Sequence, residues 1–389
     1  MADLYRLPSL DLEDAHVIAQ IDDMRVHLAA VIRTPRRWVG GLRRTAQARA
    51  IQGSNSIEGY AVSNDDALAA VDDDEPVSAD ERTWAEILGY RQVLTYVLHM
   101  AGDPTFHLDA TVLRSMHFML LSHDLAKSPG HYRQGDIFVE NDTTGDRVYR
   151  GPDADLVPGL IDVLVASLDS TADAAPLVRA AMAHLNLVMI HPFRDGNGRM
   201  ARSLQTLVLA HSGMPEPIFS SIEEWLGRNT SDYYRILALT GARSWHPERD
   251  PHLWVKFCLR AHHMQAQTMR QRVDEAAVLG ADIEDILAAR GLPQRAFDPL
   301  FDAALGLCVR RSSYVKRSQI EERTASRDLK ALVDVGLLVA EGNTKGRFYR
   351  ASGPLRELSS ESRRRRAQLD DPYPWLIDRI RSELSRSAD

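Results

Sequence analysis

The sequence predicts an all-α protein that contains one short β-hairpin and ends in a small winged-helix module. Three patterns lead to this fold class. Helical character dominates residues 1–100 and the stretch that follows residue 197. Two short β-prone runs surround a turn-rich segment between residues 136 and 152. Two short helical segments and two further β-prone runs follow one another within residues 308–350.

The composition fits a soluble globular protein. The chain has 389 residues, of which 44% are hydrophobic and 26% charged, and this length allows two or three domains. Only Cys258 and Cys308 are present, which argues against a disulfide scaffold or a cysteine-rich metal site. The N-terminus lacks a signal-peptide pattern, and no apolar run is long enough for a membrane span. We therefore expect a cytoplasmic protein without membrane contact.

The chain is expected to contain five segments. The acidic run at residues 72–75, within the N-terminal segment, is expected to be a solvated loop. The segments are an N-terminal helical region (1–89), a central core (90–263), a helical connector (264–293), a winged helix-turn-helix (294–352), and a basic tail with a terminal helix (353–389).

The most informative stretch is HPFRDGNGRMAR at residues 191–202. It places a histidine, a carboxylate, a glycine-flanked turn and two arginines close together. Glycines allow the backbone to approach a ligand, and successive N–H groups before a helix bind anions. The helix that follows is supported by an apolar stripe with the spacing i, i+3, i+4, i+7, made of Leu204, Leu207, Val208 and His211.

Arg199 and Arg202 lie three residues apart and therefore share one face of this helix. The helix dipole disfavours cations at an N-terminus, so their position there suggests that they bind an anionic ligand. Two guanidinium groups beside an anion site suit a polyphosphate. Each feature alone is common on protein surfaces, but their combination favours a phosphate site.

Residues 191–202 resemble the signature of the Fic family, His-x-Phe-x-(Asp/Glu)-Gly-Asn-Gly-Arg-x-x-Arg, at every fixed position. The resemblance implies an all-helical core and transfer of AMP from ATP to a Ser, Thr or Tyr hydroxyl of a target protein. It also implies roles for the residues: His191 as general base, Phe193 as the anchor of the loop, Asp195 as the Mg²⁺ ligand, Gly196, Asn197 and Gly198 as the phosphate cradle, Arg199 near the β-phosphate, and Arg202 at the γ-phosphate.

Two other segments acquire a meaning from this resemblance. The hairpin at residues 136–150, with its turn at Asn141–Gly145, is similar to the flap on which Fic proteins dock the target segment by strand addition. Taken alone, it would be an ordinary surface hairpin. Tyr234 lies where relatives place a tyrosine in the adenine pocket, although an aromatic residue at helical spacing is also typical of a core.

Residues 54–59, SNSIEG, resemble the inhibitory motif (Ser/Thr)-x-x-x-Glu-(Gly/Asn) of the same family. The resemblance implies that Ser54, Glu58 and Gly59 form an inhibitory element in which Glu58 pairs with Arg202 and competes with the γ-phosphate. An arginine–carboxylate pair and an arginine–phosphate pair use the same guanidinium, so they exclude each other. The alternative is that Ser54 caps a helix and Glu58 is simply exposed.

The C-terminal module differs from the rest of the chain in charge. Residues 308–350 hold ten Lys or Arg and five Asp or Glu, a net charge of +5, whereas the whole chain carries −7. This asymmetry suggests an anionic partner such as DNA. If the module binds DNA, the contacts would come from the second helix and the wing, at Thr324, Ser326, Arg327, Lys330, Lys345 and Arg347. Winged helices also dock proteins or form homodimers, so those readings stay open. The run Arg363–Arg366 either extends the phosphate contacts or is a flexible linker.

The leading prediction is a protein adenylyltransferase that uses ATP and Mg²⁺ and is inhibited by Glu58. Two alternatives stay open. One is a related enzyme that removes AMP or transfers another phosphate-containing group. The other is a nucleotide-sensing regulator that binds DNA through residues 308–350. The intact pair of arginines favours ATP, since a nucleotide without a γ-phosphate would not need Arg202.

Overall fold

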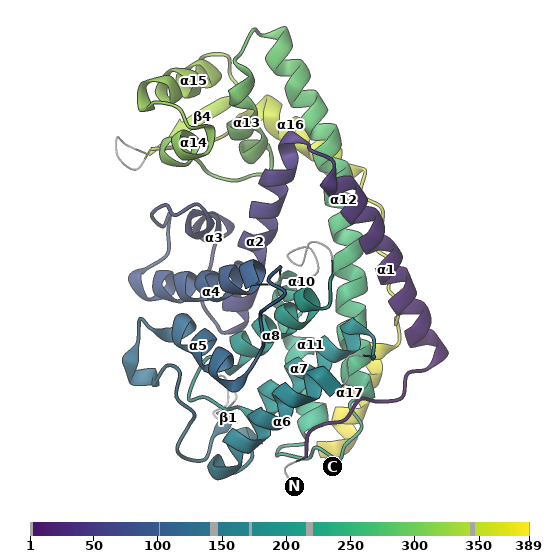
Figure 1. Ribbon diagram of the computed structural model, residues 1–389. Helices are drawn as coiled ribbons and strands as arrows, with labels where there is room; N and C mark the ends of the chain where they lie inside the picture. Colours follow the sequence, from purple (N-terminus) through teal and green to yellow (C-terminus); the bar gives the residue numbers. More distant parts are fainter. Residues whose placement is uncertain are drawn as a thin grey trace.

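The computed structural model describes residues 3–100, 102–140, 147–170, 173–214, 221–342 and 347–388. The predicted all-α class is confirmed: helices form the body of the molecule, and the described strands form one two-stranded and one three-stranded sheet (Figure 1). In the described part of the chain, no helix combines the length and the apolar character needed to cross a bilayer.

Four helices precede the central core. Their ends follow local capping: the Asp11 carboxylate accepts from the Asp14 N–H, and the Ser63 hydroxyl accepts from the Asp66 N–H. The four are α1 (Leu12–Arg33), α2 (Arg37–Ile57), α3 (Asn64–Val71) and α4 (Glu81–Met100). The expected boundary between residues 89 and 90 therefore falls inside α4.

The central core is built around α7 and α8, whose side chains are almost all buried. These helices follow each other through the loop that carries the motif, so the loop lies at one end of a well-packed pair. The elements of this region are α5 (Ala110–Leu121), η1 (Leu125–Lys127), β1 (Phe138–Glu140), β2 (Arg147–Arg150), η2 (Ala154–Leu156), α6 (Val157–Ser170), α7 (Pro176–Ile190), α8 (Asn197–His211), α10 (Glu223–Arg228) and α11 (Thr230–Gly241).

A single helix, α12 (His252–Ala289), joins the core to the C-terminal module (Figure 1). The sequence analysis places a domain boundary between residues 263 and 264, but α12 continues through it. Buried side chains recur along the helix from Trp254 to Leu287, and it ends only before Gly291, whose φ is +61°. The last helix of the core and the connector are therefore one element.

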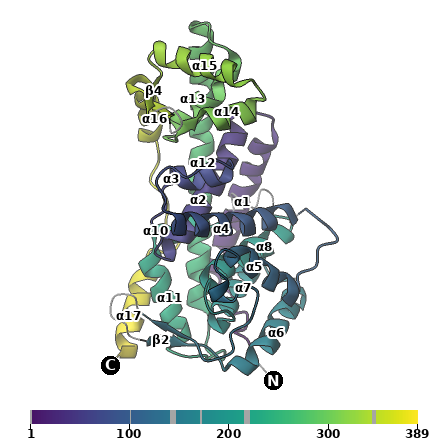
Figure 2. The same ribbon diagram turned by 90° about the vertical axis from the view of Figure 1, so that its left-hand side faces the viewer.

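The C-terminal module lies beyond α12, at the opposite end of the molecule from α6 (Figures 1 and 2). Two helices and a β-hairpin follow one another in the predicted order, and the strand order in the sheet is β3-β5-β4. Lys345, at the predicted tip of the wing, lies outside the described residues. The elements are η3 (Gln294–Ala296), α13 (Phe297–Ala304), β3 (Val309–Arg310), α14 (Arg311–Ser318), α15 (Glu322–Asp334), β4 (Leu338–Glu341), β5 (Phe348–Ala351) and α16 (Gly353–Arg364).

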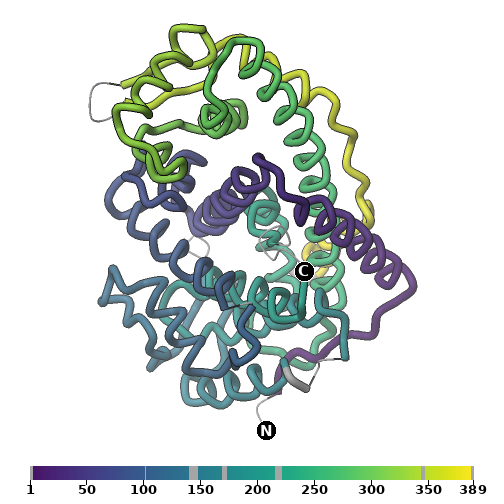
Figure 3. Tube along the Cα trace, turned by 45° about the horizontal axis from the view of Figure 1, so that its top comes forward, coloured from purple at the N-terminus to yellow at the C-terminus, as the bar shows by residue number. Residues whose placement is uncertain are grey.

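The tail after the module packs along α12, so it is not the flexible linker considered above (Figure 3). The Arg366 guanidinium pairs with Glu275, and Gln271 donates to the Ala367 carbonyl. Further along, Arg260 binds both carboxylate oxygens of Asp371. The tail ends in α17 (Leu376–Ala388), which packs against α11. The C-terminus therefore returns to the central core.

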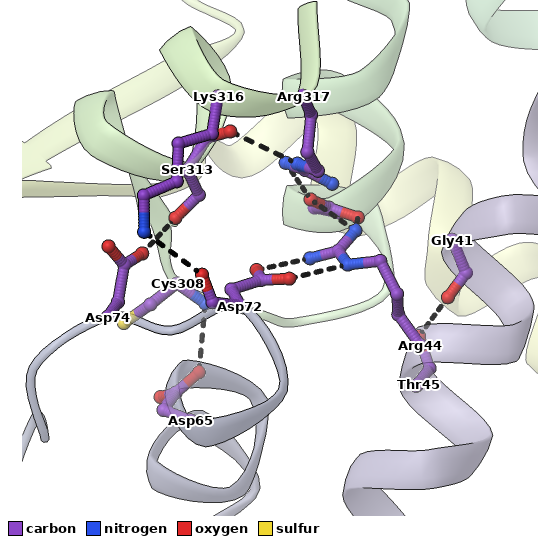
Figure 4. Close-up of polar contacts among 11 residues, drawn as sticks. Gly41, Arg44, Thr45, Asp65, Asp72, Asp74, Cys308, Ser313, Lys316 and Arg317 are labelled. Atoms are coloured by element: carbon purple, nitrogen blue, oxygen red, sulfur yellow. Dashed lines mark hydrogen bonds and ion pairs between the residues drawn. The ribbon is translucent and has the colours of Figure 1, made fainter. Parts of the chain in front are cut away.

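The predicted solvated loop at residues 72–75 is also in contact with the module (Figure 4). Arg44 of α2 binds Asp72 through two hydrogen bonds of 2.8 and 2.5 Å. The Ser313 hydroxyl donates to the Asp74 carboxylate, and the Lys316 ammonium donates to the Asp73 carbonyl at 2.9 Å. Asp73 and Glu75 are exposed as predicted, but the prediction is wrong for Asp72 and Asp74, whose carboxylates contact Arg44 of α2 and Ser313 of α14.

Candidate active site

The candidate site begins where α7 ends. His191 takes a left-handed backbone conformation with φ of +50°, and Pro192 prevents the helix from continuing. The Nδ1–H of His191 donates to the Val188 carbonyl at 3.0 Å, which leaves Nε2 with a free lone pair. Burial lowers the pKa of His191 below its usual value. The ring is therefore neutral at pH 7 and suited to accept a proton.

The loop is fixed by buried contacts. Phe193 stacks on His117 with ring centroids 3.7 Å apart, and the Asn197 side chain both accepts from the N–H and donates to the carbonyl of Phe193. The His117 Nε2–H donates to the Asp195 carbonyl at 3.0 Å. The side chain of Asn197 is thus used inside the loop, and only its backbone N–H is left for a phosphate.

Two glycines shape the start of α8. Gly196 has φ of +75°, and a Cβ at this position would lie 3.0 Å from the Leu120 side chain. A Cβ on Gly198 would lie only 2.5 Å from the Glu58 carboxylate. The carboxylate of Glu58 therefore sits directly on the N-terminal turn of α8, where an anion is favoured.

Arg202 is almost fully buried and holds three groups of the SNSIEG segment. Its Nη2 donates to Glu58 Oε1 at 2.6 Å and to the Ser54 carbonyl at 3.0 Å, and its Nε donates to the Ser54 hydroxyl at 2.8 Å. The Glu58 side chain is 22% exposed and lies at the C-terminal end of α2. Gly59, with φ of +85°, then turns the chain away from the helix.

Arg199 has a different partner, the fully buried carboxylate of Glu86 on α4. Glu86 also accepts from the Tyr60 hydroxyl at 2.7 Å and from Lys127 at 2.9 Å. Burial alone would raise the pKa of Glu86, but these partners, Arg199 above all, lower it to about 2. Glu86 is therefore charged at any physiological pH and fixes the position of Arg199.

Lys127 extends this network to Asp195. Its ammonium lies 2.7 Å from Asp195 Oδ2, while Asp195 Oδ1 accepts from the Gly196 N–H at 2.6 Å. Burial raises the pKa of Asp195, but Lys127 outweighs it and the net pKa lies below the usual value. An ionised, partly exposed carboxylate at the mouth of the site fits a magnesium ion that also binds substrate phosphates.

The sequence analysis missed Glu86, Lys127 and His117. Lys127 and His117 lie in segments without a motif, so no local pattern points to them. Glu86 carried a weak signal: it lies on the face of α4 that buries Thr83, Ile87 and Tyr90. A lone carboxylate on an apolar helix face implies a buried cationic partner.

The hairpin of the predicted flap forms beside this loop. Phe138 pairs with Arg150 and Val139 with Tyr149, and β1 is an edge strand of the two-stranded sheet. The Tyr149 hydroxyl donates to the Met189 carbonyl at 2.7 Å near the end of α7. The predicted turn at Asn141–Gly145 lies outside the described residues.

Arg133 ties the flap to the motif loop. Its Nε donates to the His191 carbonyl at 2.9 Å, and its backbone N–H donates to the Pro192 carbonyl at 3.0 Å. Tyr234 lies next to the end of α2: its ring is half exposed, and its hydroxyl donates to the Ile57 carbonyl at 3.0 Å. Its predicted contact with adenine stays a prediction.

The predicted DNA-contacting residues lie on α15 and the hairpin. Thr324 and Ser326 are partly exposed, and Arg327, Lys330 and Arg347 are exposed. Lys330 pairs with Asp334 at 2.5 Å. Several other basic residues of the module contact acidic residues or carbonyls of the same chain, namely Arg310, Lys316, Arg317 and Arg350. The positive charge of the module is thus partly balanced within the protein, and DNA binding stays a prediction.

Part of this chain is similar to known proteins. Residues 107–209 match the model of the Fic/DOC family. The protein adenylyltransferase Fic of Nematostella vectensis is 28% identical over 235 residues, which cover 59% of this chain and 52% of that protein. The protein adenylyltransferase fic-1 of Caenorhabditis elegans is 44% identical over 69 residues, which cover 18% of this chain and 12% of that protein. The matches thus span about half or less of these relatives.

Solved structures share the fold. A Fic family protein from Desulfovibrio desulfuricans G20 has a TM-score of 0.54 at 24% identity and covers 90% of this chain and 99% of its own. Fic-1 from C. elegans has a TM-score of 0.51 at 21% identity, covering 68% and 72%. Residues 107–209 therefore form a Fic/DOC family domain, and the chain shares its fold with solved Fic structures.

Proposed function

We propose that this protein transfers AMP from ATP to a hydroxyl group of a protein target and that Glu58 holds it in an inactive state. The 2.6 Å contact between Glu58 and Arg202, made over the N-terminal turn of α8, supports both halves of the proposal. The contact supports an anion site at Arg202, and it supports Glu58 as the group that occupies this site when ATP is not productively bound.

In the proposed reaction, the hydroxyl oxygen of the target attacks the α-phosphorus of ATP. A new P–O bond forms, the bond to the bridging oxygen breaks, and pyrophosphate leaves. His191 Nε2 accepts the hydroxyl proton, for which its neutral state and fixed tautomer suit it. Arg199 and the N–H groups at the start of α8 hold the phosphates, and Arg202 binds the γ-phosphate once Glu58 has left.

Magnesium would be held by Asp195 and would supply charge neutralisation on the phosphates. The target segment would add a strand to the edge of β1 that faces away from β2. Arg133 links the residues that flank the hairpin, Gly135 and Pro152, to the His191 carbonyl, so a docked segment would be held at a fixed position relative to the base.

Autoinhibition follows from competition for one guanidinium. With Glu58 on Arg202, the γ-phosphate lacks its partner and meets a carboxylate of like charge. ATP then binds without the geometry that the transfer requires. Because Glu58 is partly exposed and lies at a helix end, it can leave without breaking the core.

Incubation with labelled ATP and Mg²⁺ tests the proposal, with self-modification as the readout. We expect weak labelling of the wild type, strong labelling of Glu58→Gly and none of the double variant Glu58→Gly/His191→Ala. Label that persists without His191 would overturn the role of the base. Hydrolytic removal of AMP from a modified substrate would favour the alternative of a de-AMPylating enzyme. Absence of label in every variant, together with salt-sensitive duplex binding, would favour the DNA-binding regulator.

A further inference from the structure

Lys127 occupies a position that the sequence motif does not foresee. Both oxygens of Asp195 are already engaged, Oδ1 by the Gly196 N–H and Oδ2 by the Lys127 ammonium. The lysine is itself held on a short turn that Asp124 caps by accepting from the Ala126 N–H. It keeps a second carboxylate, Glu86, at 2.9 Å.

We propose that Lys127 is a positioning residue that stands in for the divalent cation on Asp195 and must release this carboxylate before the metal binds. This inference rests on the proposed function of Asp195. Two cations cannot share one carboxylate oxygen without strong repulsion. Glu86 retains Lys127 when Asp195 is released, so the lysine remains in the site. Lys127 therefore sets the affinity for the metal.

Binding of Mn²⁺ alone, followed by electron paramagnetic resonance, tests this role without any need for activity. Lys127→Met should bind Mn²⁺ about threefold to tenfold more tightly than the wild type, the size expected for the loss of one partly exposed ion pair. Lys127→Arg keeps a cation and should resemble the wild type. The matched control is Lys330→Met. It removes an ion pair of similar length, 2.5 Å to Asp334, that lies in the C-terminal module and not in the candidate site.

A purely structural lysine would give the opposite result, since its loss would loosen the site and weaken metal binding. Unchanged or weaker Mn²⁺ binding by Lys127→Met would therefore overturn the inference. Asp195→Asn tests metal binding by Asp195 separately from the role of Lys127. If this variant binds Mn²⁺ as well as the wild type, the proposed metal ligand is wrong, whatever the role of Lys127.

A second observation concerns the other end of α2, which touches the C-terminal module (Figure 4). Arg44 binds Asp72 and also lies 3.3 Å from Asp302 of α13. Asp302 is buried and accepts a second guanidinium, that of Arg317 on α14, at 2.6 Å. A Cβ on Gly41 would lie 3.1 Å from the Phe301 ring, so α2 and α13 are in close contact.

The C-terminal half of α2 is packed just as tightly. A Cβ on Gly53 would lie 2.3 Å from the Glu223 carbonyl, and Gly227 approaches the same position. The 21 residues of α2 form one helix about 30 Å long. A displacement of one end is therefore transmitted to the other. The helix that carries Ser54 and Glu58 is thus fixed both by α10 and by the module.

We infer that the C-terminal module clamps the inhibitory helix, so that loosening the contact between Arg44, Asp302 and Arg317 promotes the departure of Glu58 from Arg202. This inference extends the proposed autoinhibition. The basic face of the module finds its anionic partner in the Asp65–Glu75 segment: Arg350 binds Asp65 at 2.6 Å, and Arg310 donates to the Glu75 carbonyl. A competing polyanion would loosen the same contact.

Hydrogen exchange of the amides at residues 51–58 tests the clamp directly. Arg317→Ala should raise exchange in this stretch at least threefold and should raise labelling when Glu58 is present, but not in the Glu58→Gly background. The control is Arg311→Ala on the same helix, whose partners Glu322 and Ser326 lie within the module. Unchanged exchange at residues 51–58 in folded Arg317→Ala would overturn the clamp. Failure of the adenylyl transfer would show separately, as absence of label in Glu58→Gly.

Discussion

Arg199 and Arg202 lie one turn apart on α8, yet their partners differ in kind. Glu86 is fully buried, holds several cationic and hydroxyl groups, and comes from the middle of α4. Glu58 is partly exposed and lies at the end of α2, where its carboxylate contacts the N-terminal turn of α8. Removing one partner of a buried pair is costly, whereas exposed pairs contribute little. The comparison separates a permanent support, Glu86, from Glu58, which we propose as a displaceable inhibitor.

The largest effect is expected from Glu86→Gln in the Glu58→Gly background. The change leaves Arg199 and Lys127 without a buried counter-charge, which should destabilise the fold by about 3 kcal/mol and lower labelling about 100-fold or more. Glu224→Gln is the matched control, because Glu224 is a buried glutamate that pairs with Arg272 of α12 and not with the arginines of the motif. Denaturant unfolding and labelling rates measure both effects. Labelling of Glu86→Gln equal to that of its parent would remove the distinction between the two arginines.

Glu58→Gly should raise labelling and cost less stability than Glu86→Gln. We expect labelling to rise about tenfold to 100-fold while the free energy of unfolding falls by less than in Glu86→Gln, because Glu58 is partly exposed and the buried Arg202 keeps its two hydrogen bonds to Ser54. Glu58→Gln keeps a hydrogen-bonding group but loses the charge, so its labelling should be intermediate. A large loss of stability in Glu58→Gly would mean that this pair is as structural as the first.

The pH dependence of labelling tests whether His191 acts as a neutral base. Because burial lowers the pKa of His191, the ring stays neutral below pH 6.5, the usual midpoint of a histidine. The rate for Glu58→Gly should therefore still hold at pH 6.5 and fall about tenfold per pH unit only below the lowered pKa of His191. Initial rates between pH 5 and pH 8 measure this limb. A midpoint above pH 7 would contradict the buried, neutral base.

The smallest effect is expected from Ser54→Ala. It removes the hydroxyl that accepts from Arg202 Nε at 2.8 Å, a hydrogen bond worth about 1 kcal/mol, so labelling should rise about fivefold at most. The control is Thr45→Ala, which removes a buried hydroxyl of the same helix that donates to the Gly41 carbonyl. Equal labelling of the two variants would show that Ser54 does not help to hold Arg202.

The structure also explains why some predictions from sequence were wrong. The acidic run at residues 72–75 has the composition of a solvated loop, but Arg44 and the basic face of α14 lie opposite it. The tail at residues 363–366 is basic and lacks apolar residues, yet Arg366 pairs with Glu275. In both segments the side chains that form the contacts come from distant positions in the sequence. The composition of a segment therefore does not predict whether it faces water or another part of the protein.

Local sequence patterns were enough to predict the helix that begins at Asn197, the hairpins, and the set of functional residue types at residues 191–202. These depend on contacts within a few residues, such as the bonds of Asn197 to Phe193. Only the tertiary structure decided which acid faces which arginine, how Lys127 meets Asp195, and how the module reaches α2. Those contacts join residues separated by 68 to more than 250 positions, and they form because packing of the helices brings charges together that could not be buried alone.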